Sequence, residues 1–201
     1  MVTRFKSISS NGMASAFSNS VKRAVLSVLL LACLLAPLPS ATLERLSLNQ
    51  MILASTAIVR AKVTSSYAAF SGPIIYTHYQ IRVSETLKGS SAGAVEFVVQ
   101  GGVANNLRQT FSGVPQFSVG DEYVFFLWTG KRGVTQIMGL TQGLFSVAQD
   151  GSANPTTTRS ANHEVMLQRG TGQQVKDQTL VMTMSQLRAQ IAATMAGKGA
   201  N

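Results

Sequence analysis

The sequence predicts a mainly β protein, built as an antiparallel barrel or sandwich. Apolar and polar residues alternate in several short segments in the middle of the chain, which is the period of a half-buried strand. Turn signals separate these segments at intervals of roughly 8–12 residues, and no helical pattern lies between them. The chain has 201 residues, 45% apolar and 12% charged, which excludes a disordered acidic chain and a coiled coil and fits one ordinary domain.

Residues 1–41 have the pattern of a secretory signal peptide. Four basic residues and no acid precede residue 24, and an apolar run from Ala24 to Ala36 follows them. This run is shorter than the roughly 20 residues of a membrane-spanning helix, so an uncleaved anchor is the weaker alternative. We expect cleavage after Ser40 or Ala41. The mature chain would then carry no transmembrane span and would be periplasmic or extracellular.

Cys33 leaves an alternative open, because Leu30 to Cys33 (LLAC) resembles a bacterial lipobox. A lipidated Cys33 would anchor the same domain to a membrane. Against this, the apolar run continues to Ala36, where a lipoprotein normally becomes polar. Cys33 is the single cysteine, so a mature chain without it can form no internal disulfide. From residue 42 onward, 13 basic residues face 8 acidic ones, so the net charge falls from +9 to +5.

Residues 42–149 are the expected barrel domain. The segment Tyr123–Trp128 is apolar at every position and predicts a strand buried on both faces. The segment Ile58–Val63 alternates instead, with Val59, Ala61 and Val63 inward. The full set of expected elements is a short helix at 43–54 and strands at 58–63, 75–87, 95–100, 107–111, 123–128, 134–138 and 143–147.

Residues 150–201 are expected to form a C-terminal extension. Its polar stretch 150–162 predicts a loop. Two further strands are expected, at residues 165–168 and 178–183. A terminal helix should follow, started by Thr183 or Ser185 and ended by Gly197. Its apolar stripe consists of Met184, Leu187, Ile191 and Met195.

The barrel segments also carry a family resemblance. The strand Ile58–Val63, the glycine pair Gly101-Gly102, the entry Phe117–Tyr123 and the stretch Gln142–Phe145 resemble a loose group of uncharacterised exported bacterial proteins. Those proteins have an OB-like or netrin/TIMP-like small β-barrel, and the resemblance covers roughly residues 44–148. It implies a small antiparallel OB-like β-barrel with a short N-terminal helix and a C-terminal helix, and an extracytoplasmic setting. It supplies no catalytic residue.

The candidate functional residues are basic. They point outward from two neighbouring expected strands or lie at a hairpin tip beside Trp128. In OB-type barrels a strand face and its loops are the usual ligand platform, so these residues predict binding of an anionic ligand. They are Arg60, Lys62, His78, Arg82, Lys131 and Arg132. The expected partner is an anionic glycan or an unidentified protein. Nucleic acid is not expected, because an exported chain rarely meets it.

A hydrolase is the competing interpretation. Gly89 to Gly93 (GSSAG) matches the G-x-S-x-G nucleophile pattern, and Asp121 and His163 follow Ser91 in the chain order of α/β-hydrolases. That motif requires a strand-to-helix turn, and a strand is expected after Gly93 instead. We therefore expect a non-catalytic binding or assembly module.

Neither a metal nor a cofactor is expected. His163-Glu164 begins like an H-E-x-x-H zinc motif, but Leu167 stands where the second histidine would be. His78 is an outward residue of a strand with no second His or Cys at ligand spacing, so we expect it to be solvated.

The signal-peptide interpretation predicts the mass of the mature protein. Intact-mass measurement of the exported protein should give a chain that begins at Ala41 or Thr42. Cys33→Ala should leave maturation and solubility unchanged. A mature chain that begins at a lipid-bearing Cys33 would establish the anchored alternative.

Overall fold

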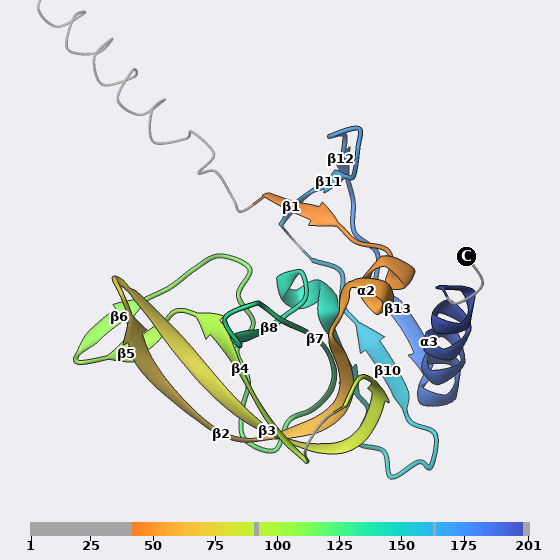
Figure 1. The fold of residues 1–201 in the computed structure, drawn as a ribbon, viewed down its shortest axis with the longest axis horizontal. Coiled ribbons are helices and arrows are strands. Elements are labelled where there is room, and N and C mark those ends of the chain that lie inside the picture. The colour runs from red at the N-terminus through yellow and green to blue at the C-terminus, as the bar shows by residue number, and fades with distance from the viewer. Residues whose placement is uncertain (1–41, 91–92, 163, 199–201) are drawn as a thin grey trace, which may run out of the picture. The chain divides into compact units, whose positions relative to one another are not determined.

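A computed structural model describes residues 42–90, 93–162 and 164–198 of the chain. The expected signal peptide, Cys33 and the cleavage positions Ser40 and Ala41 lie outside the described residues. The described part is mainly β, with antiparallel sheets, as the sequence predicted (Figure 1). Its elements are β1 (Thr42–Arg45), α2 (Leu48–Ala54), β2 (Ala57–Ser71), β3 (Ile74–Lys88), β4 (Ala94–Gln100), β5 (Gly102–Ala104), β6 (Leu107–Gln109), β7 (Glu122–Thr129), β8 (Thr135–Ile137), the 3₁₀ turn η1 (Leu140–Gly143), β9 (Leu144–Val147), β10 (Thr156–Arg159), β11 (Val165–Gln168), β12 (Gln174–Val175), β13 (Leu180–Thr183) and α3 (Met184–Lys198).

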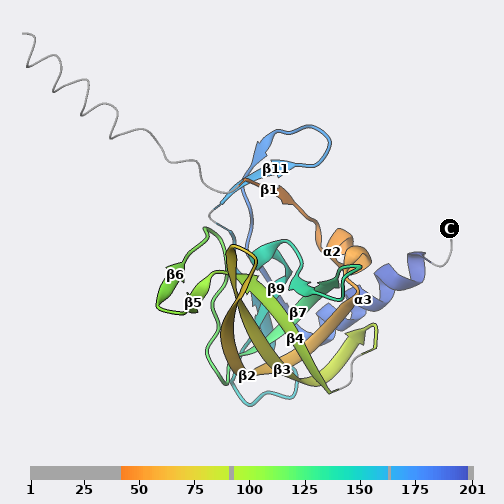
Figure 2. The same cartoon turned by 60° about the vertical axis from the view of Figure 1, so that its left-hand side comes forward.

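The main sheet has eight strands in the order β13-β10-β9-β7-β2-β3-β4, and β8 pairs with β7 beside this path. Each neighbouring pair is antiparallel. Strand β4 also lies against β8, although no strand pairing joins these two among the described residues. Strands β2, β3 and β4 curve side by side (Figure 2). A separate sheet joins β1 in parallel to β11 and β11 in antiparallel to β12.

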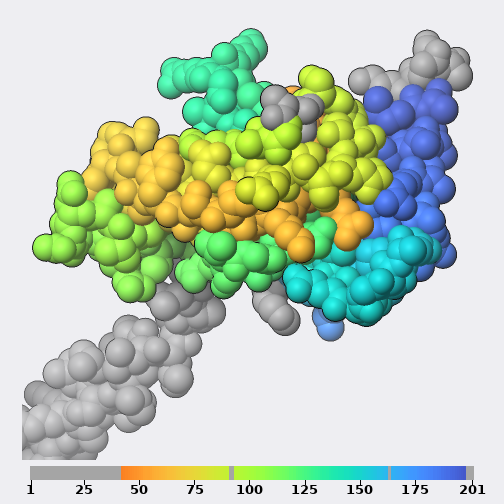
Figure 3. Space-filling model, turned by 90° about the horizontal axis from the view of Figure 1, so that it is seen from below, coloured from red at the N-terminus to blue at the C-terminus, as the bar shows by residue number. Residues whose placement is uncertain are grey.

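Two apolar cores lie on opposite faces of the central strands. The inner core contains the inward residues of β2, β3, β4 and β7, among them Phe97 and Phe125. The outer core lies between the other face of β2 and β7 and the two helices. Figure 3 shows α3 in blue at one end of the β2–β3 strands, and the β5–β6 hairpin in green at the other end. This division explains why Tyr123–Trp128 is apolar throughout: Phe125 and Leu127 enter the inner core and Val124 and Phe126 the outer one.

Local signals fix both helices. Ser47 starts α2 with a capping box, in which Gln50 N donates to Ser47 Oγ and Ser47 N donates to Gln50 Oε1. Thr183 starts α3 in the same way with Gln186, as predicted. Lys88 ends α2, because its ammonium donates to the carbonyl oxygens of Ile52 (2.6 Å), Leu53 (3.0 Å) and Ser55 (2.6 Å). The end of β3 is thereby attached to the end of α2.

The structure corrects several boundaries. Residues 43–54 hold strand β1 before the helix, which begins only at Leu48. Ile58 was expected to face outward among the charges, yet it is fully buried in the outer core. Helix α3 continues to Lys198, so Gly197 does not end it. In the predicted stripe, Met184, Leu187 and Ile191 are buried.

The largest error concerns the stretch 150–162, which was expected to be a loop but contains β10 between β9 and β13. Two of its polar side chains have partners inside the protein, although Nε of the buried Arg159 has none among the described residues. Thr157 is fully buried and its hydroxyl donates to Met182 O (2.9 Å). Arg159 forms a buried ion pair with Asp177, in which Nη2 and Oδ1 are 2.6 Å apart. The two further strands expected at 165–168 and 178–183 are present as β11 and β13, but they do not pair with each other, because β11 pairs with β1 and β12 and β13 pairs with β10.

No helix in the described part of the chain is long and apolar enough to cross a membrane.

The buried Arg159–Asp177 pair predicts a large stability effect. Asp177→Asn should lower the free energy of unfolding by about 3–5 kcal/mol, because the Arg159 charge would stay buried without its partner. Arg169→Gln removes an ion pair with Glu44 whose side chains are 68% and 47% exposed, and it should cost about 1 kcal/mol or less. Urea denaturation measures both values. Equal losses in the two variants would contradict a structural role for the buried pair.

The contact between α3 and β3 predicts a pH effect. Hydrogen bonding to Arg188 lowers the pKa of Glu85 below its ordinary value of 4.5. A lowered pKa stabilises the fold above the unfolded value and loses this contribution as the pH falls through the folded value. Urea denaturation of wild type and Glu85→Gln should therefore differ modestly at pH 7, and the difference should shrink below pH 4.5. A difference that grows in acid would contradict this assignment.

Candidate functional site

Three of the predicted basic residues line one hollow on the outside of the strands, which we call the outer hollow. It has a volume of about 420 Å³ and lies between β3 and β4 on one side and the β7–β8 hairpin on the other. Its lining residues are Ser71, Tyr76, His78, Val98, Trp128, Gly130, Lys131, Arg132, Val134 and Gln136. None of them carries a carboxylate. The site therefore combines cationic and aromatic side chains.

The β7–β8 hairpin places Lys131 and Arg132 at its tip. Leu127 pairs with Ile137 and Thr129 with Thr135. The turn is closed by bonds from Gly130 N to Val134 O and from Gly133 N to Gly130 O, both 2.9 Å. The segment near residue 130 projects from the body of the molecule (Figure 3). Both basic residues are exposed, and neither forms an ion pair with any residue that the structure describes.

The indole of Trp128 lies close to the same turn. A Cβ atom on Gly130 would lie 3.0 Å from Cη2 of the indole, so the glycine leaves room for the ring beside the turn. The Trp128 side chain is still 46% exposed, and it faces the outer hollow. An aromatic surface thus lines the same hollow as two cations.

The opposite wall comes from β3 and β4, where His78 is paired with Val98. His78 is not the solvated residue that the sequence predicted. Its ring stacks on Tyr67 with centroids 4.5 Å apart, and Nδ1 lies 2.8 Å from Glu96 Oε1. The Tyr67 hydroxyl donates to Glu96 Oε2 (3.3 Å), and desolvation, followed by the charge of Glu96, raises the pKa of Tyr67. Glu96 therefore holds both aromatic rings from outside the hollow.

The other three predicted residues lie elsewhere. Glu122 binds Arg60, with Nε 2.6 Å from Oε1, and also lies 3.7 Å from Lys62 Nζ. Arg82 pairs with Lys62 in the β2–β3 register. None of the three lines the outer hollow. The basic residues expected to form one surface therefore lie in two places. In one of them, Glu122 partly neutralises Arg60 and Lys62.

Apart from Trp128, the lining residues that were not predicted as candidates are Ser71, Tyr76, Val98, Gly130, Val134 and Gln136. Nothing in the local pattern showed that β4 would lie against β8.

The hydrolase interpretation involves residues that the structure describes only in part. Ser91 and His163 lie outside the described residues. Gly89 and Gly93 both have positive φ, and strand β4, not a helix, follows Gly93. Asp121 stabilises a loop, since its Oδ2 accepts a hydrogen bond from Ser118 N (2.8 Å). Within residues 42–90, 93–162 and 164–198, no group of three or more His, Cys, Asp or Glu side chains could hold a metal ion.

Comparisons of the chain with protein-family models, with curated proteins and with solved structures find no match.

Proposed function

We propose that this chain is an exported, non-catalytic binding domain with an OB-like barrel, and that the outer hollow binds an acidic glycan. The observation that carries the proposal is the convergence of Lys131, Arg132 and His78 with Trp128 and Tyr76 in one hollow without a carboxylate. The residues come from strands separated by about fifty positions, so local sequence alone does not bring them together.

The order of five strands around the inner core supports the OB-like part of the proposal. Strand β2 pairs with β3 and β3 with β4, while β2 also pairs with β7 and β7 with β8. Strand β4 lies against β8 without pairing. An OB-fold is a partly open five-stranded barrel, and the unpaired contact between β4 and β8 fits such an opening.

The position of the outer hollow supports the ligand class. OB-folds bind oligosaccharides and oligonucleotides on the face of their second and third strands, with the loops between strands 1 and 2 and between strands 4 and 5. When β2 is counted as the first strand, the corresponding parts here are the outer face of β3 and β4, Ser71 at the β2–β3 turn, and the β7–β8 turn. All three line the outer hollow.

The chemistry of the lining suits an acidic sugar. The Arg132 guanidinium can form a forked pair of hydrogen bonds to a carboxylate or sulfate, and the Lys131 ammonium adds a second charge. The exposed indole of Trp128 offers an apolar surface for the carbon face of a sugar ring. A glycan is favoured over nucleic acid because residues 1–41 predict export.

Heparin, an acidic glycan, is the probe for this proposal. The protein should be retained on heparin beads and released as salt rises, because screening weakens the charge contacts. Lys131→Glu should weaken heparin binding roughly fivefold, since it reverses a charge at the hollow. Lys176→Glu is the matched control: it makes the same change of charge at an exposed residue beside β12 and should leave binding nearly unchanged. Equal losses in both variants would mean that only net charge matters and would refute the site.

Tryptophan fluorescence supplies an independent readout of the same proposal. Trp128 is the single tryptophan of the chain, so its emission reports on the outer hollow alone. A heparin oligosaccharide should change the emission of the wild type and protect it from acrylamide quenching, with little effect in Lys131→Glu. Binding of the oligosaccharide without any change in Trp128 emission would place the ligand elsewhere.

A further inference from the structure

A second hollow opens on the other face of the same two strands, and we call it the inner hollow. Along β3, Tyr76 and His78 line the outer hollow, whereas Thr77 and Tyr79 line the inner one. On β4, Val98 lines the outer hollow and Val99 the inner one. No residue lines both hollows. The inner hollow has a volume of about 250 Å³ and lies at the edge of the inner core, under the β5–β6 hairpin.

Two glycines allow the chain to cover this side of the barrel. Gly101 and Gly102 have φ values of +97° and +134°. A Cβ atom on Gly102 would lie 2.5 Å from Thr77 Oγ1, and one on Gly101 would lie 2.9 Å from Gln109 O. Thr77 Oγ1 itself donates to Gly101 O (2.7 Å). The sharp turn after β4 therefore brings the β5–β6 hairpin, and Arg108 with it, next to the inward residues of β3 and β4.

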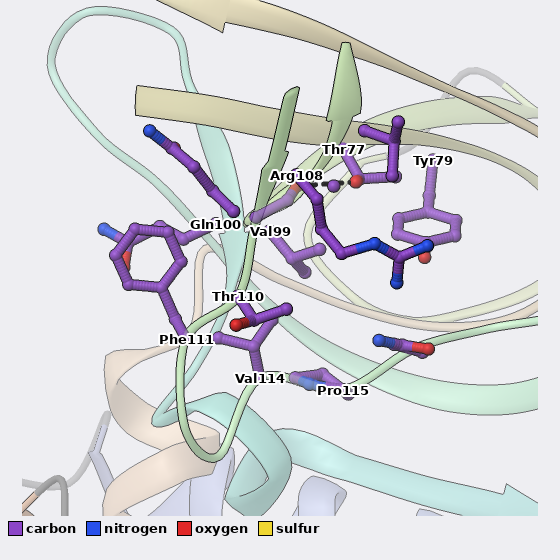
Figure 4. A pocket seen from close by; sticks show the side chains of 14 residues that line it. Thr77, Tyr79, Val99, Gln100, Arg108, Thr110, Phe111, Val114 and Pro115 are labelled. Carbon is purple, nitrogen blue, oxygen red and sulfur yellow. Dashed lines mark hydrogen bonds between the residues drawn. The ribbon is translucent and has the colours of Figure 1, made fainter. Parts of the chain in front are cut away.

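Arg108 enters the inner hollow from β6, and Figure 4 shows its side chain extending toward Tyr79. Its guanidinium forms neither an ion pair nor a hydrogen bond with any residue that the structure describes. No Asp or Glu lines this hollow. Arg108 is therefore a cation whose forked donors face the cavity without a protein acceptor.

Tyr79 supplies a second hydrogen-bond donor to this hollow. The residue is only 6% exposed, and its hydroxyl has no hydrogen-bond partner among the described residues. Its ring is fixed by Phe97, stacked at 5.5 Å, and by Phe117, edge-on at 5.0 Å. The Tyr79 hydroxyl and the Arg108 guanidinium therefore both line this hollow as donors without a protein acceptor.

We infer that the inner hollow binds the carboxylate of a small organic acid. The Arg108 fork and the Tyr79 hydroxyl can both donate to the carboxylate oxygens. The apolar lining residues Val99, Val114 and Pro115 would contact the hydrocarbon part of the acid (Figure 4). The volume is below the roughly 300–1,000 Å³ of pockets for drug-sized ligands, so a short-chain monocarboxylate is the expected size.

Hexanoate and benzoate are suitable probes, and hexan-1-ol is the neutral comparison. The NMR sample is the mature protein isolated from the cell. In two-dimensional titrations, both acids should shift its amide signals of Tyr79, Val99 and Val114. Tyr79→Phe removes only the hydroxyl, and Arg108→Gln removes only the charge of an exposed residue, so both variants should fold. Each should weaken hexanoate binding on the order of tenfold, the loss expected for a hydrogen bond to a charged group. Binding of hexan-1-ol should not change.

Arg132→Gln is the matched control, because it removes the same kind of cation from the outer hollow. It should leave hexanoate binding unchanged, while Arg108→Gln should leave heparin retention unchanged. The inference is overturned if neither acid shifts these signals, if hexan-1-ol binds as tightly as hexanoate, or if both variants keep wild-type affinity for hexanoate. Heparin binding is tested separately, so failure of one site does not imply failure of the other.

Discussion

Burial of strands β2 and β7 on both faces is the constraint on which the rest of the structure depends. Phe125 and Phe126 are adjacent in the sequence, fully buried, and contribute to different cores. Each buried phenylalanine contributes about 1.5–3 kcal/mol to folding, so neither face can be left to solvent. Helices α2 and α3 pack on one face, and the inward residues of β3 and β4 pack on the other. A polar ligand site must therefore lie where this two-sided burial ends.

Both hollows lie at such margins, on opposite faces of β3 and β4. The alternation of side chains along a strand sends His78 to one hollow and Tyr79 to the other, although the two residues are neighbours in the chain. Their surroundings differ accordingly. The outer hollow has exposed cations beside an exposed indole, whereas the inner hollow has one cation and one tyrosine hydroxyl beside the apolar residues Val99, Val114 and Pro115. A larger polar ligand suits the first site, and a small acid with an apolar tail suits the second.

The sequence analysis succeeded where a local pattern decides the outcome and failed where a distant partner does. The apolar segment around Phe125 predicted a strand buried on both faces, and Thr183 predicted the start of the last helix; both predictions were confirmed. The stretch around Thr157 was expected to be a loop because its residues are polar. In the folded protein Met182 O accepts a hydrogen bond from the Thr157 hydroxyl, and Asp177 neutralises Arg159. The same residues therefore form a strand between β9 and β13. The acceptor and the counterion lie 25 and 18 positions away, outside any local window.

The sequence by itself determined the β class, most strand positions and the basic character of the hairpin tip beside Trp128. Periodicity and turn residues encode these features within a few positions of each other. Only the tertiary structure decided which basic residues share a site. Lys131 and His78 line the same hollow because β4 lies against β8, whereas Arg60 is paired with a glutamate 62 residues further along the chain. Charge pairing and strand contact act through space, so they depend on how the sheet curves and not on the spacing of residues along the chain.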